Sequence, residues 1–404
     1  MADEKKLVRM LDALGRVSDE TGKLTRTFHS PAMQRANALV GGWMREAGLA
    51  VREDAVGNLI GRHPGAKAGA KTLLLGSHLD TVRDAGRFDG PLGVLLPIVA
   101  LEILKKRGVV LPFAVEVLGF AEEEGVRFAS AYLGSEGFTG RLKAKTLALR
   151  DSDGVSVGEL LGKKFTLPKP AHRRGDLLGY VEVHIEQGPV LEAKGLAVGV
   201  VSAIAGQSRF RLTWTGKAGH AGTTPMALRR DALAGAAEFA LAAEKLARGT
   251  AGLVATVGAM TVSPGAANVI PGQVVHTLDV RHASDVVRRK ALLALGRSAA
   301  AIASKRGLTV RWQRTQDNGA VACSPDLTAR LERSVKAVQG RSLKLVSGAG
   351  HDGVVVSQLT PVAMLFVRCR DGLSHHPDEH AAPRDLAVAL RVMVDFLERL
   401  AHSS

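Results

Sequence analysis

Two short apolar runs on either side of a helix-length segment constrain the fold of this chain more than any other feature. The runs are Thr72–Gly76 and Leu111–Phe120, and the segment between them is Val94–Arg107. Runs in which neighbouring positions are apolar are typical of strands buried on both faces, as in parallel sheets. A strand, a helix and a strand in this order predict an α/β layer. We therefore expect an α/β domain with a mostly parallel sheet.

The middle of the chain has a different order of elements. Its expected elements are strand 209–215, helix 225–248, strand 253–262, strand 273–281, helix 285–305 and strand 309–313. This β-α-β-β-α-β order is that of a small ferredoxin-like α+β domain. We expect a metal-binding catalytic domain formed by 1–206 and 316–404, interrupted by an inserted domain at 207–315. In the larger domain we expect helices within 5–48, 324–340 and 383–402, and a strand at 362–368.

The chain is basic, with 54 Lys and Arg against 39 Asp and Glu and a formal net charge of +15. Its basic clusters are short and scattered, and aromatic residues make up only 4%. A surface on which nucleic-acid bases could stack is therefore poorly supplied. We expect a solvated basic exterior and no nucleic-acid partner.

The sequence also bears on the cellular compartment. Two cysteines cannot form a disulfide framework, so a reducing compartment is the default expectation. The opening MADEKK has no apolar core behind it, unlike a secretory signal. Each apolar stretch is shorter than the ~20 residues that span a membrane. We expect a cytoplasmic protein with no membrane partner.

Acidic and histidine residues gather directly after the two predicted strands. GSHLDTV and FDGPLG contain His78, Asp80 and Asp89, and AEEEGVRF contains Glu123 and Glu124. Three adjacent carboxylates repel one another, and a bound cation would relieve that repulsion. Functional groups of parallel sheets collect at the carboxyl ends of strands, so both motifs are candidate metal sites. Taken alone, each motif is also compatible with an ordinary polar turn.

Two further motifs add histidines. VEVHIEQGP places His184 on a predicted strand, and DGLSHHPDEH places His375 and His376 after another. A lone histidine on a strand is more often structural than functional. Together with the acidic residues, these histidines supply nitrogen and oxygen ligands without a thiolate, a set suited to zinc, manganese or a similar divalent ion. One aspartate shared by two ions is the arrangement of hydrolytic two-metal sites.

The order of the motifs resembles that of a known family. The ordered set is GSHLDTV, FDGPLG, EEEGVRF, HIEQGP, GKAGHAGTTPM, ANVIPG, LDVRH, SGAGHD and LSHHP. It is similar to the amidase/hydantoinase/carbamoylase branch of the dinuclear zinc metallopeptidase superfamily, which includes allantoate amidohydrolases and N-carbamoyl-L-amino acid hydrolases. HIEQGP and GHAGTTPM distinguish this branch from aminoacylases and carboxypeptidases. The resemblance implies a metal-bearing domain interrupted by a lid that also dimerises.

For the metal site, the resemblance implies two divalent ions per subunit, zinc or manganese, with cobalt or nickel able to replace them in vitro. It assigns as ligands His78, Asp89, Glu124, His184 and His375, with Asp89 bridging the ions. Glu123 matches the general base, and Asp80 matches the residue that orients His78. The family often has Asn after the last histidine ligand, whereas this chain has His376. We favour His375, because the Ser-His pair keeps its place relative to the following proline.

For the substrate, the resemblance implies contacts from the inserted domain. His220 in GKAGHAGTTPM matches a catalytic residue that reaches across a homodimer and polarises the scissile carbonyl. Asn268 and Arg281 match groups that bind the substrate carboxylate, for which the planar fork of arginine is suited. Other positions that fall on the pocket lining are Gln187, Gln207, Gly350 and His351.

The expected activity is metal-dependent cleavage of the ureido C–N bond of a small carboxylate substrate, either allantoate or an N-carbamoyl-L-amino acid. Glu123 would take a proton from a water held between the metals and return it to the departing nitrogen. Cleavage of dipeptides or acyl-amino acids is an alternative within the superfamily. A catalytically silent basic binding protein is an alternative of another class, but all five expected ligands and the base are present.

Overall fold

The computed structural model describes residues 2–402, which form two compact units. Unit 1 comprises the residues up to Ser202 and those from Cys323 onward, and unit 2 comprises Ala203–Ala322. Each unit has its own cluster of buried apolar side chains. Within residues 2–402, no helix combines the length and the apolar character that crossing a membrane requires.

The large sheet has a parallel centre and antiparallel edges. In spatial order its strands are β1 (Ala50–Glu53), β2 (Leu59–His63), β4 (Ala114–Phe120), β3 (Thr72–His78), β5 (Leu177–Ile185), β16 (Val362–Val367), β6 (Val198–Ile204) and β14 (Val321–Ala322), with β15 (Lys344–Ser347) also paired to β6. The four neighbours β4, β3, β5 and β16 are parallel. β1, β2, β6 and β14 pair antiparallel. The expected α/β fold with a mostly parallel main sheet is confirmed.

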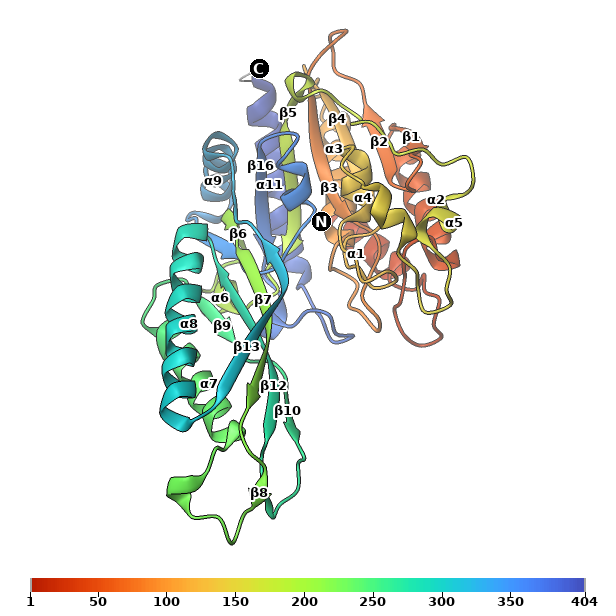
Figure 1. Ribbon diagram of the computed structural model, residues 1–404. Coiled ribbons are helices and arrows are strands. Elements are labelled where there is room, and N and C mark those ends of the chain that lie inside the picture. The colour runs from red at the N-terminus through yellow and green to blue at the C-terminus, as the bar shows by residue number, and fades with distance from the viewer. Residues whose placement is uncertain (1, 403–404) are drawn as a thin grey trace. The chain divides into compact units, whose positions relative to one another are not determined.

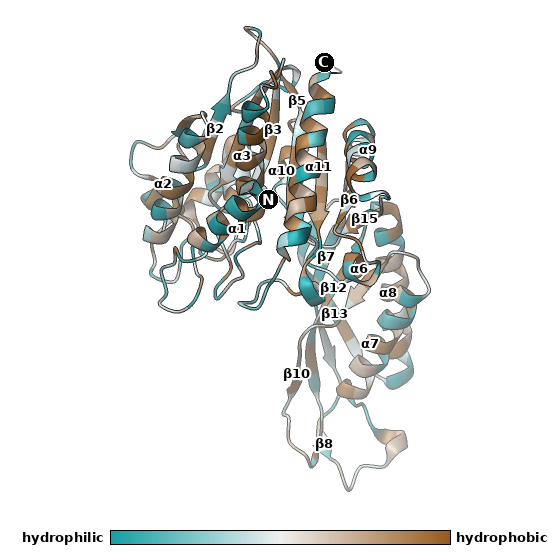
Figure 2. Cartoon of the chain, turned by 180° about the vertical axis from the view of Figure 1, so that it is seen from behind, coloured by the Kyte–Doolittle hydropathy of each residue, from teal (hydrophilic) through white to brown (hydrophobic). Residues whose placement is uncertain are grey.

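Helices cover both faces of this sheet (Figures 1 and 2). The helices of unit 1 are α1 (Ala2–Leu14), α2 (Pro31–Glu46), α3 (Pro91–Lys106), α4 (Leu133–Phe138), α5 (Val157–Leu161), α6 (Val190–Ala193), α9 (Pro325–Gln339), α10 (Gly353–Val356) and α11 (Pro383–His402). α3 lies against β3, β4 and β5, and both α1 and α11 pack on α3. Because α3 is enclosed in this way, it is apolar around most of its circumference.

Unit 2 is an antiparallel sheet covered by two helices. Its elements are β7 (Gly206–Thr215), β8 (Gly219–His220), α7 (Ala232–Arg248), β9 (Val254–Thr256), β10 (Met260–Ser263), β11 (Val269–Ile270), β12 (Gln273–His282), α8 (Asp285–Arg306) and β13 (Thr309–Asn318). The sheet order is β10-β12-β7-β13, β9 pairs with β12, and β8 pairs with β11 in a separate ribbon. The buried Trp214 indole donates to His276 Nε2 at 2.9 Å, which satisfies its polar atom inside the core.

Several elements differ from the sequence expectation, and three of the differences can be located in the structure. The segment 5–48 is helical only in part: α1 ends at Leu14 and α2 begins at Pro31, where Ser30 caps it by accepting the Met33 N–H. The helix expected from residue 225 begins only at Ala232, where the Asp231 side chain caps it. The strand expected at 253–262 is interrupted between β9 and β10, where the Ala259 N–H donates to the Thr277 side chain.

The parallel strands position the candidate site. His78 is the last residue of β3, His184 lies one residue before the end of β5, and the acidic triplet directly follows β4. The register pairs His78 with Phe120 and His184 with Phe366. The ends of four neighbouring strands therefore lie at one edge of the sheet, which is where parallel α/β sheets carry their functional groups.

The close approach of α3 to the sheet can be tested at Gly93. A Cβ at this position would collide with Val183 O and would lie 2.7 Å from the Ser77 Cβ. We predict that Gly93→Ala lowers the free energy of unfolding by about 1–3 kcal/mol through overpacking. Gly296→Ala, inside α8 with no atom within 4 Å of the new Cβ, should raise it by about 0.5–1 kcal/mol. Urea denaturation measures both, and equal effects would contradict the close packing of α3.

Candidate metal centre

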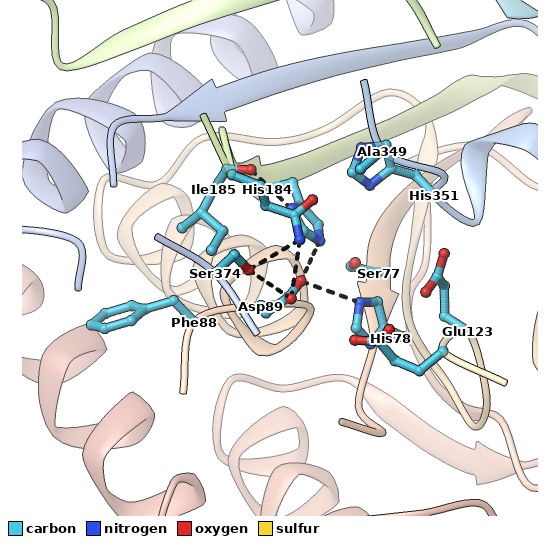
Figure 3. Close-up of polar contacts among 12 residues, drawn as sticks. Ser77, His78, Phe88, Asp89, Glu123, His184, Ile185, Ala349, His351 and Ser374 are labelled. Carbon is cyan, nitrogen blue, oxygen red and sulfur yellow. Dashed lines mark hydrogen bonds and ion pairs between the residues drawn. The ribbon is translucent and has the colours of Figure 1, made fainter. Parts of the chain in front are cut away.

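The candidate site is built around Asp89, which directly precedes α3 (Figure 3). Gly90 follows it with a φ of 83°, a conformation that favours glycine. A Cβ at Gly90 would lie 2.5 Å from the His78 ring, so the loop passes the imidazole without room for a side chain. The start of α3 also favours a carboxylate at this place, because the amino end of a helix is electropositive.

The two oxygens of Asp89 face different partners. Oδ1 lies 3.1 Å from His184 Nε2 and 3.8 Å from His78 Nε2. Oδ2 lies 3.1 Å from His375 Nε2, which is 3.7 Å from Glu124 Oε1. One carboxylate is thus shared by two three-residue groups, His78–Asp89–His184 and Asp89–Glu124–His375, whose potential ligand atoms lie within 4.8 Å of one another.

Backbone oxygens orient two of the histidine rings. His78 Nδ1 lies 3.0 Å from the Asp80 carbonyl oxygen, and His184 Nδ1 lies 3.0 Å from that of Ile185. Each Nδ1–H can donate there, which leaves the Nε2 lone pair directed towards Asp89. Although burial lowers the pKa of His78, the hydrogen bond and charge of Asp80 outweigh it and raise that pKa well above its usual value.

Asp80 has a second contact that the sequence did not reveal. Its Oδ1 accepts the backbone N–H of Glu123 at 3.0 Å, and its Oδ2 accepts that of Glu124 at 3.2 Å. The Asp80 Oδ1 also lies 3.3 Å from His78 Nδ1. One carboxylate therefore fixes both the histidine at the end of β3 and the acidic loop after β4.

The acidic loop carries negative charge that its own arginine does not neutralise. Burial raises the pKa of Glu123 well above its usual value. Burial and, next, the charge of Asp89 raise the pKa of Glu124 to about 7. Arg127, the nearest arginine in sequence, instead pairs with Asp151 at 2.9 Å and donates to the Phe28 carbonyl. The local charge balance therefore favours a cation between the carboxylates.

The structure distinguishes the two adjacent histidines of the tail motif. His375 faces Asp89 and Glu124 as described, and its φ of 57° turns its ring into the cluster. His376 Nδ1 instead accepts the N–H of Asp378 at 3.1 Å. His375, not His376, is therefore the one that lies with the other candidate ligands. The hydrogen bond from His375 to Asp89 raises the pKa of this imidazole to about 9.

A support for Asp89 was missed in the sequence. The buried Glu379 accepts the N–H groups of Phe88 and Asp89 through Oε1, at 2.9 and 3.2 Å. Ser374 Oγ lies 2.9 Å from Glu379 Oε2 and 3.0 Å from Asp89 Oδ2. Glu379 belongs to the same tail motif as His375, but its partners are some 290 positions earlier, and no local pattern predicts such a contact.

The other pocket candidates of unit 1 lie close to this cluster. Gln187 donates through Nε2 to Asp89 Oδ2 at 3.1 Å. The His351 ring centroid is 4.6 Å from that of His184, and its Nε2 is hydrogen-bonded to Ser347 Oγ at 2.7 Å. Burial lowers the pKa of His351 well below its usual value, so the imidazole is neutral. Gly350 is exposed beside it, with the Tyr132 hydroxyl in the space that a Cβ would need.

The remaining candidates lie in unit 2 and form two groups. His220 on β8 and Asn268 beside β11 are exposed neighbours, joined where the Ala221 N–H donates to the Asn268 carbonyl. Gln207 and Arg281 meet at Asp279, to which they donate at 2.8 and 2.9 Å.

Comparisons with known proteins identify the family. Residues 74–399 match peptidase family M20/M25/M40. The chain belongs to this family. It is 41% identical to allantoate deiminase 2 of Glycine max, over 97% of this chain and 89% of that one. It is also 41% identical to the N-carbamoyl-L-amino acid amidohydrolase of Geobacillus stearothermophilus, over 99% of both chains.

A solved structure gives the branch within the M20 family. The chain is similar to an amidase of the hydantoinase/carbamoylase family from Burkholderia multivorans, with a TM-score of 0.93 and 34% identity over 98% of each chain. This chain is thus an M20-family hydrolase of the hydantoinase/carbamoylase branch. Membership implies divalent metal ions, and the cluster fits them, because its donors are imidazole nitrogens and carboxylate oxygens with two three-residue groups around one shared aspartate.

The choice between the two tail histidines of this M20 hydrolase can be tested by metal content. His375→Ala removes one nitrogen from the Asp89–Glu124–His375 group, so we predict that the purified variant binds less divalent metal than the wild type. His376→Ala is the matched control and should keep the wild-type content. Elemental analysis after dialysis measures both. Loss of metal from the His376 variant alone would contradict the assignment.

Proposed function

We propose that this M20 hydrolase cleaves the ureido C–N bond of a small carboxylate substrate, with allantoate and N-carbamoyl-L-amino acids as the candidates. The sharing of Asp89 between two ligand groups, with Glu123 next to Glu124, carries the proposal. Equal identity to a relative named allantoate deiminase and to one named N-carbamoyl-L-amino acid amidohydrolase supports both substrates. The proposed metal content is two divalent ions per subunit, zinc or manganese.

Glu123 is suited to carry the proton in this reaction. Its backbone is held by Asp80, and burial favours the protonated form of its carboxyl. In its ionised form, a carboxylate with a raised pKa is a stronger base than an ordinary one, so it can take a proton from the attacking water and then, as the protonated acid, deliver that proton to the departing nitrogen. Divalent ions held by the two ligand groups would supply Lewis-acid chemistry at the ureido carbonyl and would make the water more acidic.

We assign substrate binding to residues of both units. Arg281 and Asn268 are the proposed partners of the substrate carboxylate, and His220 is the proposed donor to the carbonyl oxygen as negative charge develops on it. Asp279 supports the first role, because it accepts from Arg281 Nε and Nη2 at 2.9 Å and so fixes the guanidinium plane. The proposed pocket lining is completed by Gln187, Gln207, Gly350 and His351.

We propose that unit 2 is a lid and dimerisation domain whose partner is a second copy of this chain. Its edge strands β9 and β10 expose Val254 and Met260, and the segment after β8 exposes Met226 and Leu228, which are 76% and 73% exposed. Exposed strand edges and apolar side chains of this size favour pairing with another chain. In such a dimer, His220 would act in the site of the partner copy.

The activity is tested by ammonia release from allantoate and a panel of N-carbamoyl-L-amino acids. We predict that removing metal with a chelator abolishes turnover and that zinc or manganese restores it. Glu123→Gln should lower kcat by about 10²–10⁴-fold, because the proton carrier is lost, while metal content stays unchanged. Glu398→Gln, which affects a partly exposed ion pair with Arg107, is the control and should keep full activity.

Two outcomes would contradict this proposal. Full turnover by the metal-free protein would exclude the metal-dependent reaction, and full turnover by the Glu123 variant would exclude its role as proton carrier. If dipeptides or acyl-amino acids were cleaved and ureido acids were not, the hydrolase would instead be a peptidase or acylase.

The proposed role of His220 across a dimer is tested by mixing variants. His220→Ala and Glu123→Gln should each be inactive, because each removes one part of every site. After mixing and exchange of subunits, heterodimers carry one intact site, and about a quarter of the wild-type activity should return. Light scattering monitors dimer formation. Mixed dimers without any recovered activity would show that His220 serves its own subunit.

A further inference from the structure

The positive charge of this chain is concentrated in unit 2. Residues 203–322 contain 16 Lys and Arg against 6 Asp and Glu, a net charge of +10 out of +15 for the whole chain. Unit 2 thus carries two thirds of the net charge in fewer than a third of the residues. Surface charge that serves only solubility is usually of mixed sign, so the excess of positive charge in unit 2 needs a reason.

One face of the small sheet is packed and the other is open. Leu212 and Trp214 of β7, with Val274 and Leu278 of β12, are buried with side chains of α7 and α8. Alternate residues of a strand point to opposite faces, so the residues between them form an outward surface (Figure 1). This surface, called the open face, comprises the outward side chains Gln207, Arg209, Arg211, Thr213, Thr277, Asp279, Arg281, Arg311 and Gln313.

The open face holds four arginines and one acidic residue. Asp279 accepts from Arg209 Nε at 2.8 Å and from Arg281 Nη2 at 2.9 Å, so two guanidinium groups share one carboxylate. Gln207 donates to the same carboxylate at 2.8 Å. Although burial opposes it, these hydrogen bonds lower the pKa of Asp279 and keep it ionised. Even the paired part of the open face therefore retains a positive charge.

The other two arginines of the open face add to this charge. Arg211 and Arg311 are exposed, and within residues 2–402 neither forms an ion pair with a carboxylate. The register places Arg211 between Thr277 and Gln313, and it pairs Arg311 with Thr213. The two arginines are diagonal neighbours on adjacent strands, where like charges repel. Their placement therefore costs stability and is not explained by the packing of unit 2.

We propose that the open face attracts carboxylate-bearing substrates electrostatically and raises their concentration around Arg281. This inference rests on the proposed function, in which Arg281 binds the substrate carboxylate. A surface of one charge sign raises the local concentration of the opposite ion and the rate at which it arrives. The outward positions of β7, β12 and β13 hold no aromatic side chain on which a nucleic-acid base could stack. Small carboxylates therefore fit the open face better than nucleic acid does.

The inference is tested with Arg211→Gln/Arg311→Gln in the full-length holoenzyme. At low salt the double variant should raise KM about twofold, because the register places the two arginines roughly 13 and 20 Å along the sheet from Arg281, and two unit charges at these distances in water attract an anion by about this factor. The change in kcat should be small, since neither arginine is among the proposed metal ligands, the proton carrier or the groups proposed to contact the substrate. At 0.5 M salt the difference in KM should disappear through screening.

Arg297→Gln/Lys305→Gln is the matched control, because it removes the same charge from exposed positions in the second half of α8, far along the chain from Arg281, and α8 packs on the opposite face of the sheet. This control should change KM much less, and a neutral amide of the substrate should show no salt dependence with any variant. Equal KM changes in the two double variants would overturn the inference, since they would reflect net charge alone. An unchanged KM in the Arg211/Arg311 variant would also overturn it.

Failure of the proposed function gives a different result. If the wild type releases no ammonia from any ureido acid, the substrate assignment is wrong, and the open face can still be examined on a carboxylate cation-exchange resin. The Arg211/Arg311 variant should then elute at lower salt than the equally charged Arg297/Lys305 variant. Identical elution would show that the open face has no special affinity for carboxylates.

Discussion

The carboxylate of Asp89 is the constraint on which the rest of the candidate site depends. Three imidazoles from three separate parts of the chain approach it. His184 lies 3.1 Å from one oxygen and His375 3.1 Å from the other, while His78 lies 3.8 Å from the first. A buried carboxylate is stable only when hydrogen bonds or opposite charges compensate it. The neighbours of Asp89 supply this compensation. Gly90 and Glu379 hold the backbone of Asp89 in place and are not themselves candidate ligands.

The same principle applies to the acidic loop after β4. Asp80 binds the loop through two backbone N–H groups, while Arg127, the only basic residue in the motif, is used elsewhere. The loop backbone is held in place while the carboxylates of the loop are not neutralised by Arg127. Their mutual repulsion therefore costs free energy, and a bound cation would remove that cost. This links the local backbone structure to metal affinity, because ligands that are already in place lose little conformational entropy when an ion arrives.

Much of the fold was predictable because it depends on local patterns. Apolar runs predicted the buried parallel strands, and the β-α-β-β-α-β order predicted unit 2. Some boundaries were predicted wrongly, because they depend on a single cap or on a contact with a neighbouring strand. One example is the start of α7, which was expected at 225 and lies at Ala232. At the candidate site the sequence singled out the residues after each parallel strand, and the topology explains why these ends meet.

Long-range contacts could not be predicted in this way. The hydrogen bonds of Glu379 to the Asp89 loop and the second contact of Asp80 join segments that no local pattern relates. The open face of unit 2 is likewise visible only once the register places Arg211 and Arg311 on one side of the sheet. Charge counting showed that the chain is basic, but not that four arginines share one face of the small sheet with a single carboxylate.

The position of His375 along the chain has a consequence for biosynthesis. The His78–Asp89–His184 group is complete once the first 184 residues have been made, whereas the second group waits for a residue that follows all of unit 2 and the strand β16. A ribosome must therefore synthesise the chain through His375 before the shared aspartate has both sets of neighbours. Fragments that stop earlier contain the His78–Asp89–His184 group, but they lack His375 and cannot form the second group.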